Sequence, residues 1–180
     1  MKLFIISDIH GSLYYLKKVM EIFEKENYDK LVILGDELYH GPRNPLPKDY
    51  SPKEVIEILN KYKDKIIAVR GNCDSEVDQM VLSYPIMSDY SMIYLGNKRV
   101  FLTHGHIYNI DNPLPMSEGD ILLYGHFHIP MIEKKEERYF FNPGSISLPK
   151  NNSNHSFAIL DETKFQIKDL DENILMEINF

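Results

Sequence analysis

Polar residues that can bind a metal ion follow five short apolar runs of the chain, each at the point where the run ends. In chain order these groups are Asp8-Ile9-His10, Gly35-Asp36, Gly71-Asn72-Cys73-Asp74, His104-Gly105-His106 and Gly125-His126-Phe127-His128. Carboxylate, amide and imidazole donors together suit Mn²⁺, Zn²⁺ or Fe better than Ca²⁺. A single cysteine cannot build a structural zinc site, so the pattern indicates a catalytic metal centre.

Taken singly, each group also has an ordinary structural explanation. Asp8 and His10 can belong to a strand-to-helix turn, and Gly35-Asp36 is a common turn dipeptide. His126 and His128 alternate along an extended segment and face the same way, as two ligands or two residues of a surface hairpin would. The occurrence of all five groups after apolar runs favours the metal site over coincidence.

The apolar runs themselves are predicted to be strands. Residues 2–7, 31–34 and 66–69 are typical of buried parallel strands, and further strands are expected over 92–95, 99–102, 121–124, 139–141, 157–160, 165–167 and 174–178. Ser12 can cap a helix, and Ser51-Pro52 with Glu54 predicts a capping box at the start of another. In open α/β sheets ligands bind beyond the carboxyl ends of the strands, so groups far apart in the chain can meet there.

Length and composition limit the classes of protein to consider. The chain has 180 residues and no linker-like stretch, which predicts one domain over residues 1–180. Its formal net charge of −7 and lack of a basic tract argue against general nucleic-acid binding and against a membrane-surface role. One cysteine fits a reducing compartment, and no apolar run is long enough for a signal peptide or membrane span. We therefore expect a cytoplasmic protein.

The ordered groups resemble the calcineurin-like metallophosphoesterase superfamily. Its pattern is D-x-H, G-D, G-N-[HC]-[DE], H-G and G-H-x-H, which this chain matches in order from Asp8 to His128. The stretch Asn142-Pro143-Gly144-Ser145 is similar to a segment of the small bacterial members. Gly41-Pro42-Arg43-Asn44 resembles the YfcE-type phosphodiesterases within that group. The resemblance extends from Met1 to about Phe157.

This resemblance implies a single-domain, four-layer α/β/β/α sandwich with two metal ions at the strand ends. By motif, Asp8, His10, Asp36 and His128 would hold the first ion, and Asp36, Asn72, His104 and His126 the second, with Asp36 bridging. Mn²⁺ is the first choice for both ions, with Zn²⁺, Fe or Ni²⁺ as alternatives. A hydroxide bridging two ions about 3.5–4 Å apart would attack the phosphorus of a small phosphodiester. Asp36, Asn72 and His104 are thus expected at the reaction centre.

Cys73 is the position at which the chain departs from many members of the superfamily. Those members have a histidine directly after the asparagine, where it can assist the leaving group or the substrate phosphate. A thiol is a weak hydrogen-bond donor, and loss of a positioned acid typically costs about 10²–10⁴-fold for poor leaving groups. Cys73 therefore favours diesters or activated esters over ordinary alkyl monoesters, as in the YfcE-type enzymes, which also have cysteine here.

Three further residues are weaker candidates for the site. Asp74 and His106 follow predicted ligands closely, so each can orient a ligand, contact substrate or serve the local fold. Arg43 lies in the proline-rich loop of residues 37–50 and can meet a substrate phosphate or remain in solvent.

Other functions and assemblies stay open at this stage. A phosphomonoesterase could use the same dinuclear site, and some relatives with this fold are non-catalytic scaffolds. Intact ligand positions argue against the scaffold. The loop with Tyr39, Pro42 and Pro45 could also pair subunits into a homo-oligomer.

Overall fold

In the computed structural model, which describes residues 1–180, every side chain of β1 (Leu3–Ile6) is buried. Successive side chains of a strand point to opposite faces of its sheet. Phe4 and Ile6 pack in the core beneath the helices, whereas Leu3 and Ile5 pack in the core between the two sheets. Full burial of each such side chain contributes about 1.5–3 kcal/mol. The predicted parallel strand is confirmed, and it forms the centre of the molecule.

The first sheet contains six strands in the order β11-β10-β9-β1-β2-β3. Its other members are β2 (Lys30–Ile33), β3 (Ile66–Ala68), β9 (Ser156–Leu160), β10 (Lys164–Asp169) and β11 (Ile174–Asn179). The three strands β1, β2 and β3 run parallel, so their carboxyl ends lie at one edge. The strands from β9 onwards are antiparallel to their neighbours and extend the sheet on its other side.

The second sheet contains five strands in the order β4-β5-β6-β8-β7. Its members are β4 (Tyr90–Leu95), β5 (Lys98–Thr103), β6 (Ile121–Leu123), β7 (Pro130–Lys135) and β8 (Arg138–Pro143). The predicted hairpin at Gly96 is present, since Leu95 pairs with Lys98 across the turn. β5, β6 and β8 are parallel, and β7 is a strand that the sequence patterns did not predict.

Three helices accompany the sheets, namely α1 (Leu13–Lys25), α2 (Pro52–Lys61) and α3 (Glu76–Val81). Ser12 caps α1 as predicted, because its side chain accepts the backbone N–H of Tyr15. The capping box predicted at Ser51 is wrong, since the Ser51 hydroxyl donates to the Glu54 carboxylate and accepts no hydrogen bond from a helix N–H. None of these helices has the length and apolarity to cross a lipid bilayer.

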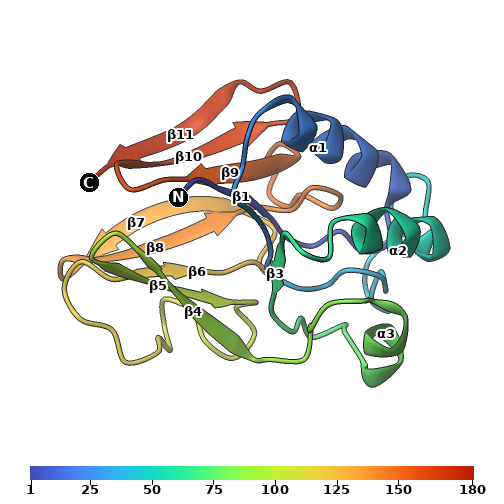
Figure 1. The fold of residues 1–180 in the computed structure, drawn as a ribbon, viewed down its shortest axis with the longest axis horizontal. Helices are drawn as coiled ribbons and strands as arrows, with labels where there is room; N and C mark the ends of the chain where they lie inside the picture. The colour runs from blue at the N-terminus through green and yellow to red at the C-terminus, as the bar shows by residue number, and fades with distance from the viewer.

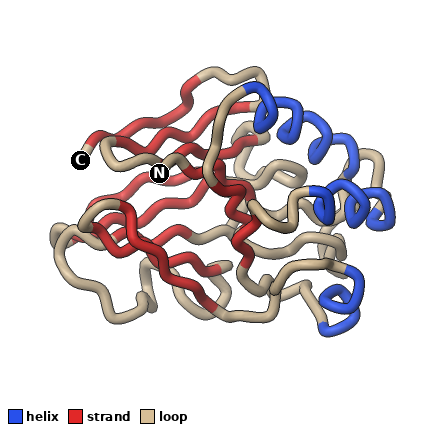
Figure 2. The backbone as a smooth tube through the Cα atoms, in the orientation of Figure 1, coloured by secondary structure: helices blue, strands red, loops and turns tan.

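The helices lie together at one side of the molecule, and the sheets stack beside them (Figures 1 and 2). α1 and α2 cover the first sheet through a large apolar core, and a second core fills the space between the sheets. On the outer face of the second sheet, a loop that includes Tyr108, Ile110 and Leu114 packs on Phe101 and Phe140. The expected mixed α/β fold with two sheets is confirmed, and its fourth layer is this loop rather than a helix.

Candidate metal centre

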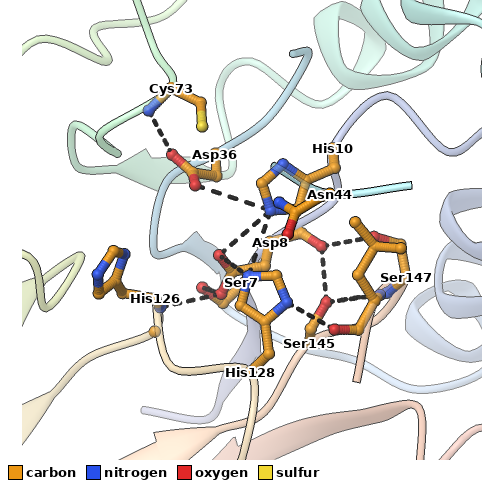
Figure 3. A network of polar contacts seen from close by, with 12 residues as sticks. Ser7, Asp8, His10, Asp36, Asn44, Cys73, His126, His128, Ser145 and Ser147 are labelled. Carbon is orange, nitrogen blue, oxygen red and sulfur yellow. Dashed lines mark hydrogen bonds and ion pairs between the residues drawn. The ribbon is translucent and has the colours of Figure 1, made fainter. Parts of the chain in front are cut away.

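All seven predicted ligands lie at the carboxyl ends of strands from both sheets. Asp8 and His10 follow β1, Asp36 follows β2, and Asn72 follows β3. His104 follows β5, while His126 and His128 follow β6. Backbone hydrogen bonds join these ends, since Asp8 donates its N–H to Gly35 and Gly125 donates to His104. The structure therefore brings the predicted set together, and Figure 3 shows Asp8, His10, Asp36 and His128 grouped around one centre.

Five of these residues have a left-handed backbone, which non-glycine residues seldom adopt. The φ angles are 57° at Asp8, 49° at His10, 57° at Asp36, 66° at His126 and 60° at His128. Asp and His tolerate this region better than most residues, but each instance still costs about 1–3 kcal/mol. The turn after each strand thus holds a strained backbone that aims the side chain at the shared centre. Such strain is typical of functional sites.

The first predicted ligand set forms a tight cluster around the Asp8 carboxylate. Its Oδ1 atom lies 3.1 Å from His128 Nε2 and 3.6 Å from His10 Nε2. The two imidazole Nε2 atoms are themselves 3.3 Å apart. Asp8 Oδ1 is buried and has no hydrogen-bond partner, which is costly for a carboxylate. A cation between these three groups would satisfy it, so the residues present fit a divalent metal.

The second predicted set is built around His104. Its Nε2 atom lies 3.1 Å from Asn72 Oδ1, 3.3 Å from His126 Nδ1 and 3.4 Å from Asp36 Oδ2. Oxygen donors and imidazole nitrogens at such distances suit a borderline or hard divalent ion. The donor chemistry of this second cluster therefore also fits a metal.

Asp36 lies between the two clusters. Its Oδ1 atom accepts the backbone N–H of Cys73 at 2.8 Å, which fixes the carboxylate orientation. Its Oδ2 atom lies 3.7 Å from His10 Nε2 and 3.4 Å from His104 Nε2, so one oxygen faces both sets. This arrangement agrees with the bridging position predicted for Asp36.

The imidazole orientations leave the inward nitrogen of three histidines free to bind a metal. The outer Nδ1 of His10 donates to the Tyr39 carbonyl at 2.8 Å, and that of His104 to the Leu34 carbonyl at 2.6 Å. His128 Nδ1 donates in the same way to the Leu148 carbonyl at 2.5 Å. When the ring is neutral, a donor on one ring nitrogen leaves the lone pair on the other, as in most histidine metal sites.

The charges of the cluster are strongly coupled. Burial opposes ionisation of Asp8, but the adjacent His10 and His128 imidazoles lower its pKa well below the usual value. Burial likewise opposes ionisation of Asp36, whose pKa His104 lowers. Although burial disfavours a charged His104, Asp36 raises the pKa of this imidazole to about 9. Burial and the nearby His104 lower the pKa of His126 to about 4.

Cys73 is half-buried beside these ligands and lies beyond Asp36, on the side away from Ser145 and Ser147 (Figure 3). Burial, and then the negative charge of Asp36, raise the pKa of its thiol far above the ordinary value. In the absence of metal ions, the neutral thiol is therefore favoured over the thiolate. The Asn72 amide, which donates to its sulfur at 3.3 Å, is not a base.

The weaker candidates occupy three different positions. Asp74 is buried and accepts the backbone N–H groups of Asp36, Glu37 and Gly71 at 2.7–2.9 Å, so it joins two ligand-bearing loops. The His106 and His104 ring centroids are 5.3 Å apart, and His106 does not line the cavity that Asp36, Asn72 and Cys73 border. Arg43 lines that cavity.

The cavity above the ligands has a volume of about 470 Å³, within the range of small-molecule sites. Asp36, Asn72, His126 and His128 form part of its wall. Phe127 and Lys150 also line it, although no sequence motif singled them out. Lys150 and Arg43 take part in no ion pair, so both cations are free to meet an anion.

A second group of polar residues, whose role the sequence analysis did not predict, forms hydrogen bonds with the loops that carry predicted ligands. The hydroxyls of Ser145 and Ser147 donate to the Asp8 carbonyl at 2.9 and 2.8 Å (Figure 3). The Asn142 amide donates to the Gly125 carbonyl at 2.7 Å, and Ser7 donates to Asp8 Oδ2 at 2.7 Å. The Asn142–Ser145 motif was the sequence feature that marked this group. In the structure it contacts the loop of Asp8 and the loop of Gly125, both of which carry predicted ligands.

Comparisons with known proteins agree with this geometry. A family model described as the calcineurin-like phosphoesterase superfamily domain matches residues 1–164. Phosphodiesterase YfcE of Escherichia coli (strain K12) is 46% identical over 179 residues, covering 99% of this chain and 97% of the relative. A solved structure of Yfce, described as a phosphoesterase from E. coli, has a TM-score of 0.97 and 46% identity, covering 99% of this chain and 98% of that one.

A more distant structure shares the fold alone. Vacuolar protein sorting 29 from Cryptosporidium parvum has a TM-score of 0.67 at 20% identity and covers 99% of this chain and 97% of its own. The resemblance predicted from the ordered motifs is thus confirmed along the chain. On these matches, the protein belongs to the calcineurin-like phosphoesterase superfamily.

Proposed function

We propose that this protein is a metal-dependent phosphodiesterase that hydrolyses small phosphodiesters. The observation that carries the proposal is the convergence of seven nitrogen and oxygen donors into two sets that share Asp36 at one cavity. Membership of a phosphoesterase superfamily and 46% identity to a protein named a phosphodiesterase support the same reaction.

Asp8, His10, Asp36 and His128 would hold one divalent ion, and Asp36, Asn72, His104 and His126 the other. Mn²⁺ is the proposed ion, with Zn²⁺, Fe and Ni²⁺ as alternatives. When bound, such ions supply Lewis-acid chemistry, since they lower the pKa of water and neutralise charge on phosphate oxygens.

The chain's own groups prepare the cavity for an anion. The lowered pKa values of Asp8 and Asp36 keep both carboxylates charged at neutral pH, as metal ligands must be. Arg43 and Lys150 line the same cavity and can contact the phosphate oxygens of the substrate. The protein as a whole is acidic, with a net charge of −7, but these groups and two divalent ions would make the cavity cationic.

Cys73 supports a diester substrate rather than a monoester. Its neutral thiol lies beside Asp36, where an imidazole could instead protonate a leaving alcohol. Without a positioned acid, a poor leaving group departs slowly. The site is therefore suited to diesters or to esters with activated leaving groups.

Turnover of bis-p-nitrophenyl phosphate and of p-nitrophenyl phosphate, each measured with Mn²⁺, tests this function. We expect the diester to be cleaved with the larger kcat/KM, and the Asp36→Asn variant to lose that activity. Asp64→Asn is a matched control, because Asp64 is exposed and its side chain has no partner. A larger kcat/KM for the monoester would favour a phosphomonoesterase, while absence of both Mn²⁺ binding and turnover would favour a scaffold.

A further inference from the structure

An apolar groove adjoins the catalytic cavity, and the two share one residue, Cys73. The groove has a volume of about 480 Å³ and lies between the loop before α2, α2 itself and α3. Its apolar walls are formed mainly by Tyr39, Pro52, Ile56, Val77 and Val81. A surface concavity of this size is large enough for part of a small ligand.

The apolar side chains of α3 do not pack in the apolar core of the protein. No residue of α3 is buried, and Val77 and Val81 are 68% and 43% exposed. They are four residues apart, so they lie on the same side of the helix. α3 is held in place by polar contacts instead, because the Asn60 amide donates to the Val81 carbonyl at 2.9 Å and accepts from the Ser83 N–H at 2.8 Å.

Two polar residues of the groove, Ser75 and Asp78, are paired with each other. Ser75 and Asp78 form a capping box at the start of α3, in which the Asp78 carboxylate accepts both the hydroxyl and the backbone N–H of Ser75 at 2.8 Å. The groove thus presents mainly apolar surface to whatever enters it.

Cys73 connects this surface to the centre of the site. Its backbone N–H donates to Asp36 Oδ1, the carboxylate between the two ligand sets, and its side chain lines both hollows. Gly41 closes over the sulfur on one side, since a Cβ there would lie 3.2 Å from Sγ. A substituent on a phosphate held at the proposed metal centre beside Asp36 would reach the groove past the Cys73 side chain.

Resting on the proposed phosphodiesterase function, we infer that the groove binds an apolar alkyl or aryl group on one of the two esterified alcohols. The substrate class is then a phosphodiester with an apolar alcohol. Burial of that group against Tyr39, Val77 and Val81 would strengthen binding in proportion to the apolar area removed from water.

Methyl p-nitrophenyl phosphate and hexyl p-nitrophenyl phosphate provide the test, because both release the same leaving group. With Mn²⁺ present, we expect kcat/KM to be roughly 10- to 100-fold higher for the hexyl ester, as for five methylenes about half removed from water. Equal values for two esters that are both cleaved would overturn the inference and leave the proposed function intact. Cleavage of neither ester would defeat the proposed function, and this inference with it.

Substitutions in α3 test whether the preference for the hexyl ester depends on the groove. Val77→Asp, Val81→Asp and the milder Val77→Ser should each reduce the hexyl-to-methyl ratio toward one. Met80→Asp is the matched control, because Met80 is 84% exposed on the same helix and does not line the groove. A ratio unchanged by all three groove variants would contradict the inference. So would a wild-type ratio of one together with a smaller oligomer in Val77→Asp, measured by light scattering, because the groove would then be a subunit contact.

Discussion

Asp74 accepts the backbone N–H of Asp36 at 2.9 Å and that of Gly71 at 2.7 Å through the same carboxylate oxygen. This buried side chain therefore joins the loop after β2 to the loop after β3, each of which carries a predicted ligand. The contact between Cys73 and Asp36 Oδ1 adds a second link between the same loops. The position of Asp36 between the two ligand sets follows from these fixed backbone contacts.

Gly71→Ala should disrupt this junction. A Cβ at Gly71 would overlap the Asp36 carboxylate and backbone nitrogen, neither of which can move without displacing the ligand. We expect kcat/KM toward bis-p-nitrophenyl phosphate to fall at least about 100-fold, as for other misplaced catalytic groups. Gly119→Ala is the comparison, since a Cβ there meets nothing within 4 Å and only the positive φ is strained. Equal activity of the two variants would show that the junction does not position Asp36.

Cys73→His should widen the range of leaving groups. An imidazole at this position can donate a proton to a departing alcohol, whereas the thiol is a poor donor. We expect at least a tenfold gain in kcat/KM for an alkyl diester with a poor leaving group, and a smaller gain for bis-p-nitrophenyl phosphate. Cys73→Ala controls for loss of the thiol. If Cys73→His and Cys73→Ala gave the same rates, leaving-group assistance at this position would be excluded.

Metal binding should depend on pH through His104. Because Asp36 raises the pKa of this imidazole to about 9, a proton occupies it at neutral pH and competes with the metal. The apparent affinity for Mn²⁺ at the second set should rise about tenfold per pH unit between pH 6 and 8, and level off above pH 9. His126, with a pKa lowered to about 4, adds no competing proton in this range.

Titration calorimetry at pH 7, in buffers of different ionisation enthalpy, measures the released proton directly. About one proton should leave His104 as this set is filled. An Mn²⁺ affinity that does not change between pH 6 and 8 would contradict a protonated His104.

Much of the site could be predicted because the predicted ligands lie at strand ends. The apolar runs before Asp8, Asp36 and His104 are buried strands, as their composition indicates, and strand ends converge in this fold class. The bridging position of Asp36 came from the family resemblance, and the interatomic distances agree with it.

Other features depend on tertiary contacts that leave little local signal. β7 pairs only with β8, and three of its six residues are exposed, so no apolar run marks it. α3 has six residues and buries none of them, so no apolar periodicity marks it in the sequence. Asp8 and His10 have a left-handed backbone, which the spacing of residue types alone does not encode.

The metal content of the purified protein, measured by inductively coupled plasma mass spectrometry after dialysis with Mn²⁺, tests the central claim most directly. We predict two ions per wild-type chain and fewer than two in Asp36→Asn, with a loss of about 1,000-fold or more in diester kcat/KM. Asp64→Asn should retain both ions and full activity. A wild-type chain that binds no ion or one ion, or an Asp36→Asn variant with two ions and normal turnover, would contradict a dinuclear site bridged by Asp36.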